Sequence, residues 1–142
     1  MTPPKIKVFV DSDVIISSLI SNRGAAFILL HDQPQLSLIF SATQPEELNR
    51  VAKRLKLNLN KLNQLINLKL KMAKSKKLHF TGAEKLVIDP DDRHIAAGLI
   101  ASKPRFFISY NLKHFRTEKI KTELQRDSSL EEEVAQLRAL LK

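Results

Sequence analysis

The chain has 142 residues, of which 24 are Lys or Arg and 15 are Asp or Glu, so its formal net charge at neutral pH is +9. It contains no cysteine, which excludes disulfide bonds, thiolate zinc sites, iron–sulfur clusters and a cysteine nucleophile. No apolar run approaches the roughly 20 residues that a membrane-spanning helix needs, and we expect a cytoplasmic protein without a membrane partner. The basic surplus favours phosphate-rich partners such as nucleic acid.

The hydrophobic pattern alternates between short apolar runs and longer stretches with helical spacing. Ile6–Val10 is nearly continuous and rich in β-branched residues, which is typical of a strand buried on both faces in a parallel sheet. The alternation predicts an α/β domain with a mainly parallel sheet. The predicted strands are Ile6–Val10, Leu36–Phe40, Leu86–Ile88 and Arg105–Ser109, and the predicted helices are Val14–Ile20, Ala25–Leu30, Pro45–Leu55, Leu59–Ala73, Asp91–Ser102 and Leu130–Leu141.

Residues at the predicted helix ends and in one helix interior carry further signals. Thr43 and Glu46 have the spacing of a capping box. Asp89 is expected to cap the Asp91–Ser102 helix, with Pro90 at its first position. Gly98 lies in the middle of that helix, where we expect it to allow close packing of the helix on the sheet.

The positive charge is concentrated in one part of the sequence. Residues 48–83 contain no Asp or Glu. Such a stretch is either a solvated helix surface or an arm that holds a polyanion, and we favour the second interpretation. Its ten basic residues are Arg50, Lys53, Arg54, Lys56, Lys61, Lys69, Lys71, Lys74, Lys76 and Lys77.

Acidic residues lie at the ends of the predicted elements. Asp11 ends the first strand, and the functional crevice of an open parallel sheet lies at the carboxyl ends of its strands. Asp13 suits a helix N-cap. Glu47 and Asp92 precede apolar residues of their helices by three or four positions and are expected to face inward, whereas Asp91 lies further from that face. Three converging carboxylates would raise one another's pKa, and Mg²⁺ or Mn²⁺ would relieve the repulsion.

Other catalytic arrangements find less support. The four histidines have no HExxH spacing, and the chain has neither GxGxxG nor a P-loop. Ser109 follows a strand but lacks the flanking glycines of a nucleophile elbow. Residues 8–14 also fit the strand and DxDx[TV] pattern of haloacid-dehalogenase-like phosphatases, in which Asp11 would be the nucleophile and Asp13 the acid. That family's later Gly-Asp motif is absent from the sequence.

Four motifs in order give the chain a resemblance to the PIN domain, the metal-dependent nuclease fold of VapC-type toxins. The first is Val8–Asp13, a hydrophobic run followed by Asp-Ser-Asp. The second has Ser41 with Glu47 six residues later, and the third opens an Ala-rich helix at Asp91–Ala97. The fourth is Phe107–Asn111 with a trailing His114-Phe115. Together they extend from Val8 to Phe115.

The resemblance implies a three-layer α/β/α fold around a mainly parallel sheet of four to five strands. It assigns metal-ligand and catalytic roles to Asp11, Glu47 and Asp92, with Asn111 at the fourth acidic position. An amide oxygen can bind a hard cation but adds no charge, which leaves the number of metal ions open. The supporting residues are Ser12, Asp13, Asp91 and Ser109.

The function that follows is Mg²⁺- or Mn²⁺-dependent hydrolysis of RNA. The resemblance implies a homodimer and an antitoxin partner, and an alternative is a PIN-like protein that binds RNA or a partner without cleavage. Residues 1–116 would form the nuclease domain and residues 117–142 a helical extension, packed on the domain or on a partner chain. The residues expected to bind RNA are Arg50, Lys53, Arg54, Lys69 and Lys76.

Overall fold

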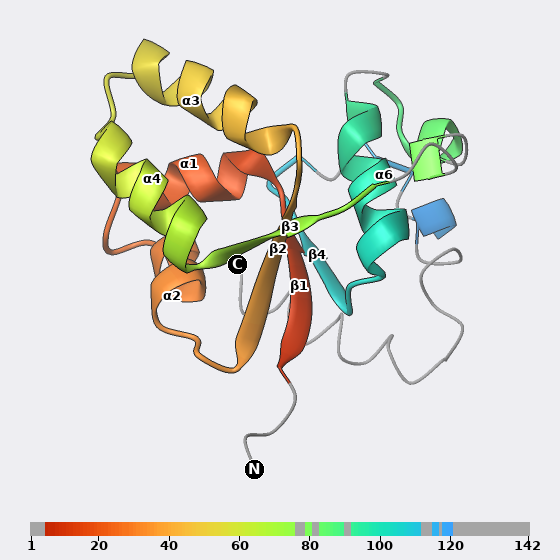
Figure 1. Cartoon of the computed structure of the whole chain (residues 1–142), viewed down its shortest axis with the longest axis horizontal. Coiled ribbons are helices and arrows are strands. Elements are labelled where there is room, and N and C mark those ends of the chain that lie inside the picture. The colour runs from red at the N-terminus through yellow and green to blue at the C-terminus, as the bar shows by residue number, and fades with distance from the viewer. Residues whose placement is uncertain are drawn as a thin grey trace.

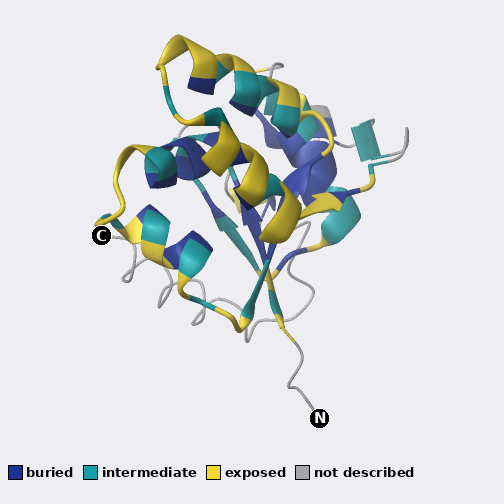
Figure 2. Ribbon diagram, turned by 60° about the vertical axis from the view of Figure 1, so that its left-hand side comes forward, coloured by how far each residue is buried: buried dark blue, intermediate teal, exposed yellow. Residues whose placement is uncertain are grey.

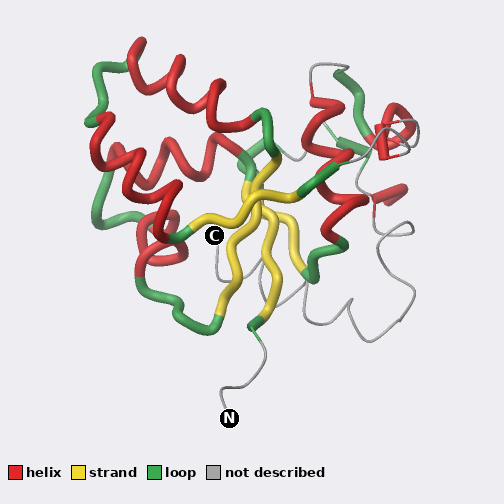
Figure 3. Tube along the Cα trace, in the orientation of Figure 1, coloured by secondary structure: helices red, strands yellow, loops and turns green. Residues whose placement is uncertain are grey.

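A four-stranded sheet lies at the centre of the computed structural model, which describes residues 5–75, 79–80, 83–89, 92–111, 115–116 and 118–120. All its pairings are parallel and the spatial order is β3-β2-β1-β4 (Figures 1 and 3). This confirms the predicted α/β class. The strands are β1 (Ile6–Val10), β2 (Leu36–Ser41), β3 (Leu70–Ala73) and β4 (Phe106–Ile108).

Helices cover both faces of the sheet, which confirms the three-layer arrangement. Of the described helices, α6 lies on one side of the sheet, and α1 to α4 lie on the other (Figure 1). Strand residues alternate between the two sides, so that Val8 and Val10 join one core cluster and Phe9 joins the other. The helices are α1 (Ser12–Ile20), α2 (Ala25–His31), α3 (Gln44–Arg54), α4 (Leu59–Leu68) and α6 (Arg93–Ser102), with a 3₁₀ turn η1 at Glu84–Leu86.

The two core clusters occupy the spaces between the sheet and its helices, as the dark blue ribbon of Figure 2 shows. The larger cluster is closed by fully buried Leu48 of α3 and Leu62 of α4. The second contains Ile95 and Leu99 of α6 together with Phe9. Burial of side chains of this size contributes about 1.5–3 kcal/mol each, which makes these clusters the main stabilising feature of the fold.

The predicted helix Leu59–Ala73 is wrong in its last part. The helix ends at Leu68, and residues 70–73 form β3 at the edge of the sheet. Leu70 and Ala73 are buried while Lys71 and Met72 are exposed. Pairing with Leu38–Ser41 of β2 satisfies the backbone of this segment, and this tertiary contact outweighs a helical pattern that continues through Leu70 and Met72.

Three local predictions near helix starts also need correction. Residues 86–88 are not a strand, since η1 ends at Leu86 and Val87 makes only an isolated bridge with Phe115. Helix α6 begins at Arg93 with Asp92 as its N-cap, rather than with Asp89. Thr43 occupies the N-cap of α3, but its side chain bonds to the Ser41 hydroxyl and makes no capping hydrogen bond, so the capping box does not form. Its backbone is helical, unlike the extended backbone typical of a capping residue.

Some sequence predictions fall outside the described residues. These are the positions of Pro90, Asp91, Lys76 and His114 and the helix Leu130–Leu141. The division into residues 1–116 and 117–142 stays a prediction. Within the described residues, no single helix is long and apolar enough to cross a membrane, although α1 and α2 pass that test as a pair bent by 103°.

Gly98 brings α6 close to the sheet, as the sequence predicts. A Cβ atom at this position would lie 2.8 Å from two ring atoms of Phe9, which is too close for a real contact. The ring has little room to move, because Phe9 is fully buried and packs edge-on against Phe107.

We expect Gly98→Ala to destabilise the protein by about 1–3 kcal/mol, although alanine is the better helix former. Urea denaturation of the two proteins measures the difference. Gly24→Ser is the matched control, because a Cβ at Gly24 meets its nearest neighbour at 3.9 Å and serine is a favoured N-cap. Equal stability of Gly98→Ala and wild type would show that the helix can move away from Phe9.

Candidate active site

The carboxyl ends of β1 and β4 meet at the point where the chain reverses the order of its strands. The connection after β1 leads through α1 and α2 to β2 on one side, whereas β4 lies on the other side of β1. Val10 and Ile108 are paired, and the amide of Asp11 donates to the carbonyl of Ile108 at 3.0 Å. Asp11 and Ser109 therefore follow neighbouring strand ends at a switch point, the usual place of a ligand crevice in open α/β sheets.

Two hydrogen bonds fix the carboxylate of Asp11. Its Oδ1 accepts from the backbone amide of Ser12 at 2.7 Å, and its Oδ2 accepts from the Ser109 hydroxyl at 2.7 Å. Asp11 is thus the N-cap of α1, a role that the sequence suggested for Asp13. Both donors hold the charged carboxylate in one orientation at the start of the helix, where the helix dipole also favours a negative charge.

Glu47 reaches the same place from the first turn of α3. Its Oε2 accepts from the Ser12 hydroxyl at 3.3 Å and lies 3.7 Å from Nε2 of His94. Burial and the charge of Asp11 raise the pKa of Glu47, while Ser12 and Arg50 act in the opposite direction. The structure therefore brings Asp11 and Glu47, which are 36 positions apart in the sequence, into one electrostatic unit.

Asp13 and Asn111 form a second part of this network. The Oδ2 atom of Asp13 accepts from the side-chain amide of Asn111 at 2.9 Å and from the backbone amide of Tyr110 at 3.1 Å. The Asn111 backbone amide donates to the Ser109 hydroxyl at 3.0 Å. Burial, followed by the charge of Asp11, raises the pKa of Asp13 to about 6. Asp13 thus anchors the segment that follows β4.

Sequence reasoning missed two residues that connect the site to the fold. Gln44 is fully buried, and its amide donates to the Val10 carbonyl at 3.0 Å and to the Ser12 hydroxyl at 3.1 Å, while its oxygen accepts from the Ser41 amide at 2.6 Å. His94 Nδ1 lies 3.1 Å from the Ser41 hydroxyl. A signal for His94 exists in the sequence, because it lies two residues after Asp92 in the Asp91–Ala97 motif. No pattern in the sequence distinguishes Gln44 from a solvent-exposed glutamine.

Asp92 begins α6, whose first turn reaches the site through His94. Among the described residues, no three His, Asp or Glu side chains form a group that could hold a metal ion. The metal-binding roles of Asp11, Glu47, Asp92 and Asn111 stay predictions. The donor chemistry nevertheless fits a hard cation, because Mg²⁺ is often held by one or two carboxylates together with water and substrate phosphate oxygens.

The basic residues of the described stretch 48–75 are all exposed. Arg50 lies in the same helix as Glu47 and lowers its pKa, which places one of these cations beside the carboxylates. Lys53 and Arg54 continue along α3, and Lys69 follows α4. Their exposure is compatible with the predicted binding of RNA, and Arg50 is the one that the electrostatics place beside the acidic centre.

The fold and the site together define a parallel α/β domain with a carboxylate centre at its topological switch point. A family model described as PIN domain matches residues 7–113, which is most of the chain. The protein therefore belongs to the PIN-domain family, whose members are generally nucleases and typically use divalent metals. Comparisons with curated proteins and with solved structures gave no match.

We expect Gln44→Ala to destabilise the fold by about 2–4 kcal/mol, because the substitution opens a cavity and leaves the Val10 carbonyl and the Ser41 amide without their partner. Urea denaturation measures the loss. Gln35→Ala removes an exposed amide that donates only to Gln33 in the described structure, and its effect should stay within about 0.5 kcal/mol. Equal effects of the two substitutions would contradict a structural role for Gln44.

The raised pKa of Asp13 predicts a pH dependence of stability without metal. As the pH rises from about 4 to about 6, the unfolded chain loses this proton while the folded chain keeps it, so the native state loses stability. Asp13→Asn removes this term, and the stability of the variant relative to wild type should increase between about pH 4 and about pH 7. Urea denaturation in EDTA measures both values; an unchanged difference would contradict the prediction.

Proposed function

We propose that this PIN-domain protein is a ribonuclease that hydrolyses RNA phosphodiesters with Mg²⁺ or Mn²⁺. The observation that carries the proposal is the convergence of Asp11 and Glu47 on Ser12, whose amide donates to Asp11 at 2.7 Å and whose hydroxyl donates to Glu47 at 3.3 Å. Burial and then the charge of Asp11 raise the pKa of Glu47. Two neighbouring carboxylates repel each other, and a doubly charged cation bound by them would relieve this repulsion. Family membership favours this function over the phosphatase alternative.

In this proposal Asp11 and Glu47 hold the cation, and Asp92 and Asn111 are further candidate ligands. Ser109 and the Ser12 amide keep Asp11 in position, while the Ser12 hydroxyl orients Glu47. The chemistry that a divalent cation supplies, when bound, is activation of water and stabilisation of negative charge on the phosphodiester.

The substrate is held through its phosphates. Arg50, Lys53 and Arg54 extend from the acidic centre along α3, so RNA bound across this helix would have a phosphate close to Glu47. Such binding neutralises phosphates and weakens with salt. On the family resemblance we also propose that the protein acts in the cytoplasm as the homodimeric toxin of a toxin–antitoxin pair.

One observation favours the alternative of RNA binding without cleavage. The fourth acidic position holds Asn111, whose amide oxygen can bind a cation but adds no charge, while its amide nitrogen donates to Asp13 at 2.9 Å. A PIN-domain protein with this arrangement would still bind RNA through its basic helices. Cleavage in the presence of metal therefore decides between the two functions.

We expect Mn²⁺-dependent cleavage of single-stranded RNA that EDTA abolishes and that Asp11→Asn reduces by about 100-fold or more, because the variant loses charge at the cation position. Glu47→Gln should have a similar effect. Glu46→Gln is the matched control, since its side chain is exposed in the same helical turn and has no hydrogen bond to the site residues described above. RNA binding that is insensitive to EDTA, without cleavage under Mg²⁺ or Mn²⁺, would support the non-cleaving alternative.

A further inference from the structure

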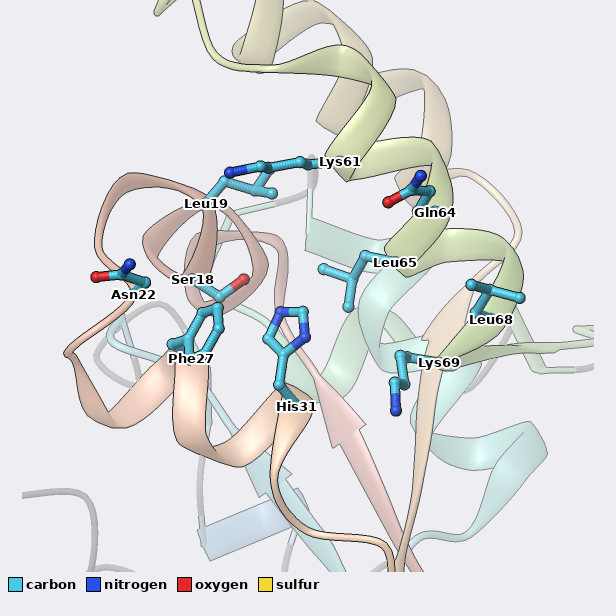
Figure 4. Close-up of a pocket in the computed structure, with 10 residues that line it drawn as sticks. All are labelled: Ser18, Leu19, Asn22, Phe27, His31, Lys61, Gln64, Leu65, Leu68 and Lys69. Atoms are coloured by element: carbon cyan, nitrogen blue, oxygen red, sulfur yellow. The ribbon is translucent and has the colours of Figure 1, made fainter.

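A second concave site lies on the helical side of the domain, away from the carboxylates. It has a volume of about 380 Å³ and lies between the end of α1, α2 and α4 (Figure 4). Among the described residues, its lining combines apolar, aromatic, amide and basic side chains and includes no acidic residue. The lining residues are Ser18, Leu19, Asn22, Phe27, His31, Lys61, Gln64, Leu65, Leu68 and Lys69.

One wall of this pocket offers a flat aromatic surface. Phe27 and His31 of α2 are stacked, with ring centroids 4.2 Å apart and ring planes 23° apart. Leu65 of α4 lies opposite them (Figure 4). Burial and the charge of Lys69 lower the pKa of His31, so this ring is neutral at pH 7. A neutral imidazole can both donate and accept a hydrogen bond, which suits a neutral ligand. Because the two rings already face each other, a nucleobase would stack on the outer face of the pair.

The other wall provides charges and amides. Lys61 and Lys69 lie at either end of the α4 segment that lines the pocket, and both are exposed. Gln64 lies between them, and Asn22 adds a second amide to the lining. Lysines bind phosphates, and amide side chains pair with the polar edges of bases. An acidic peptide would use the lysines but would leave the stacked rings of Phe27 and His31 without a specific purpose.

We propose that the pocket between α1, α2 and α4 binds one nucleotide of single-stranded RNA, with its base against Phe27 and His31 and its phosphate at Lys69 or Lys61. The volume is at the small end of small-molecule sites and suits a single nucleotide. Ser18 lines the pocket and follows Ser12 on α1 by six residues, or about 9 Å of helix rise, so the pocket and the carboxylates lie towards opposite ends of the same helix. The inference rests on the proposed function, because it assigns this pocket to the same RNA substrate.

The test is a titration of the isotope-labelled full-length protein with adenosine 5′-monophosphate in EDTA, followed by NMR. We expect backbone amide shifts centred on Phe27, His31 and Gln64. Lys69→Ala and Phe27→Leu should each weaken binding by at least about fivefold, because they remove the phosphate partner and the stacking surface. Lys85→Ala is the matched control, since it removes an exposed lysine from η1 and should leave the affinity unchanged.

Three results would overturn the inference. The first is the absence of shifts at the pocket, and the second is an equal response to inorganic phosphate, which would show that the base is not recognised. The third is a carbodiimide crosslink between Lys69 and Glu131–Glu133, because the chain's own acidic segment would then occupy the pocket. The titration requires neither metal nor RNA cleavage, so it separates the two proposals. Nucleotide binding without nuclease activity would contradict only the proposed function. Cleavage without nucleotide binding would contradict only the assignment of the pocket.

Discussion

The charge of Asp11 is the constraint on which the rest of the site depends. Together with burial, which is the larger cause, it raises the pKa of both Asp13 and Glu47, so the three carboxylates are unfavourable neighbours in the absence of a cation. The fold offsets this cost with hydrogen-bond donors. The Ser109 hydroxyl contacts both Asp11 and Asp13, while the Ser12 amide donates to Asp11 and the Ser12 hydroxyl to Glu47. A rigid, negatively charged centre results, which is the arrangement that a hard cation stabilises.

Parallel pairing is what brings these groups together. β1 is hydrogen-bonded to β2 on one side and to β4 on the other, so three chain segments end at the same edge of the sheet. Gln44 then ties two of these ends to each other by contacting Val10, Ser12 and Ser41. Since its amide is fully buried, the stability of the core and the geometry of the carboxylates depend on the same side chain.

The helical layer adds a surface of opposite charge. The exposed basic residues of α3 begin at Arg50, beside Glu47, and the pocket bounded by α4 carries Lys61 and Lys69. A nuclease needs both kinds of surface, because the basic side chains bind the polyanion while the carboxylates bind the metal ion that acts on it. The proposed nucleotide pocket extends the basic surface by adding base contacts, through which a protein distinguishes among single-stranded segments.

Elements with a strong period of their own could be predicted from the sequence. β1, β2, β4 and the helices α1 to α3 lie close to their predicted bounds, because burial on one or both faces determines where apolar residues occur. Asp11 and Ser109 could likewise be assigned to strand ends, since each directly follows a buried apolar run.

Contacts between distant elements were decided by the tertiary structure alone. Residues 70–73 became an edge strand because β2 offers them hydrogen bonds, although their own pattern continues a helix. Helix packing decides three further features, which are the burial of Gln44, the approach of His94 to Glu47 and the pocket beside Phe27. The hydrophobic periodicity of a single helix does not indicate this packing. The sequence by itself thus determined the type of those elements that have a clear hydrophobic period and the place of Asp11 at the end of the first strand, whereas the pairing of strands and the packing of helices decided which side chains meet.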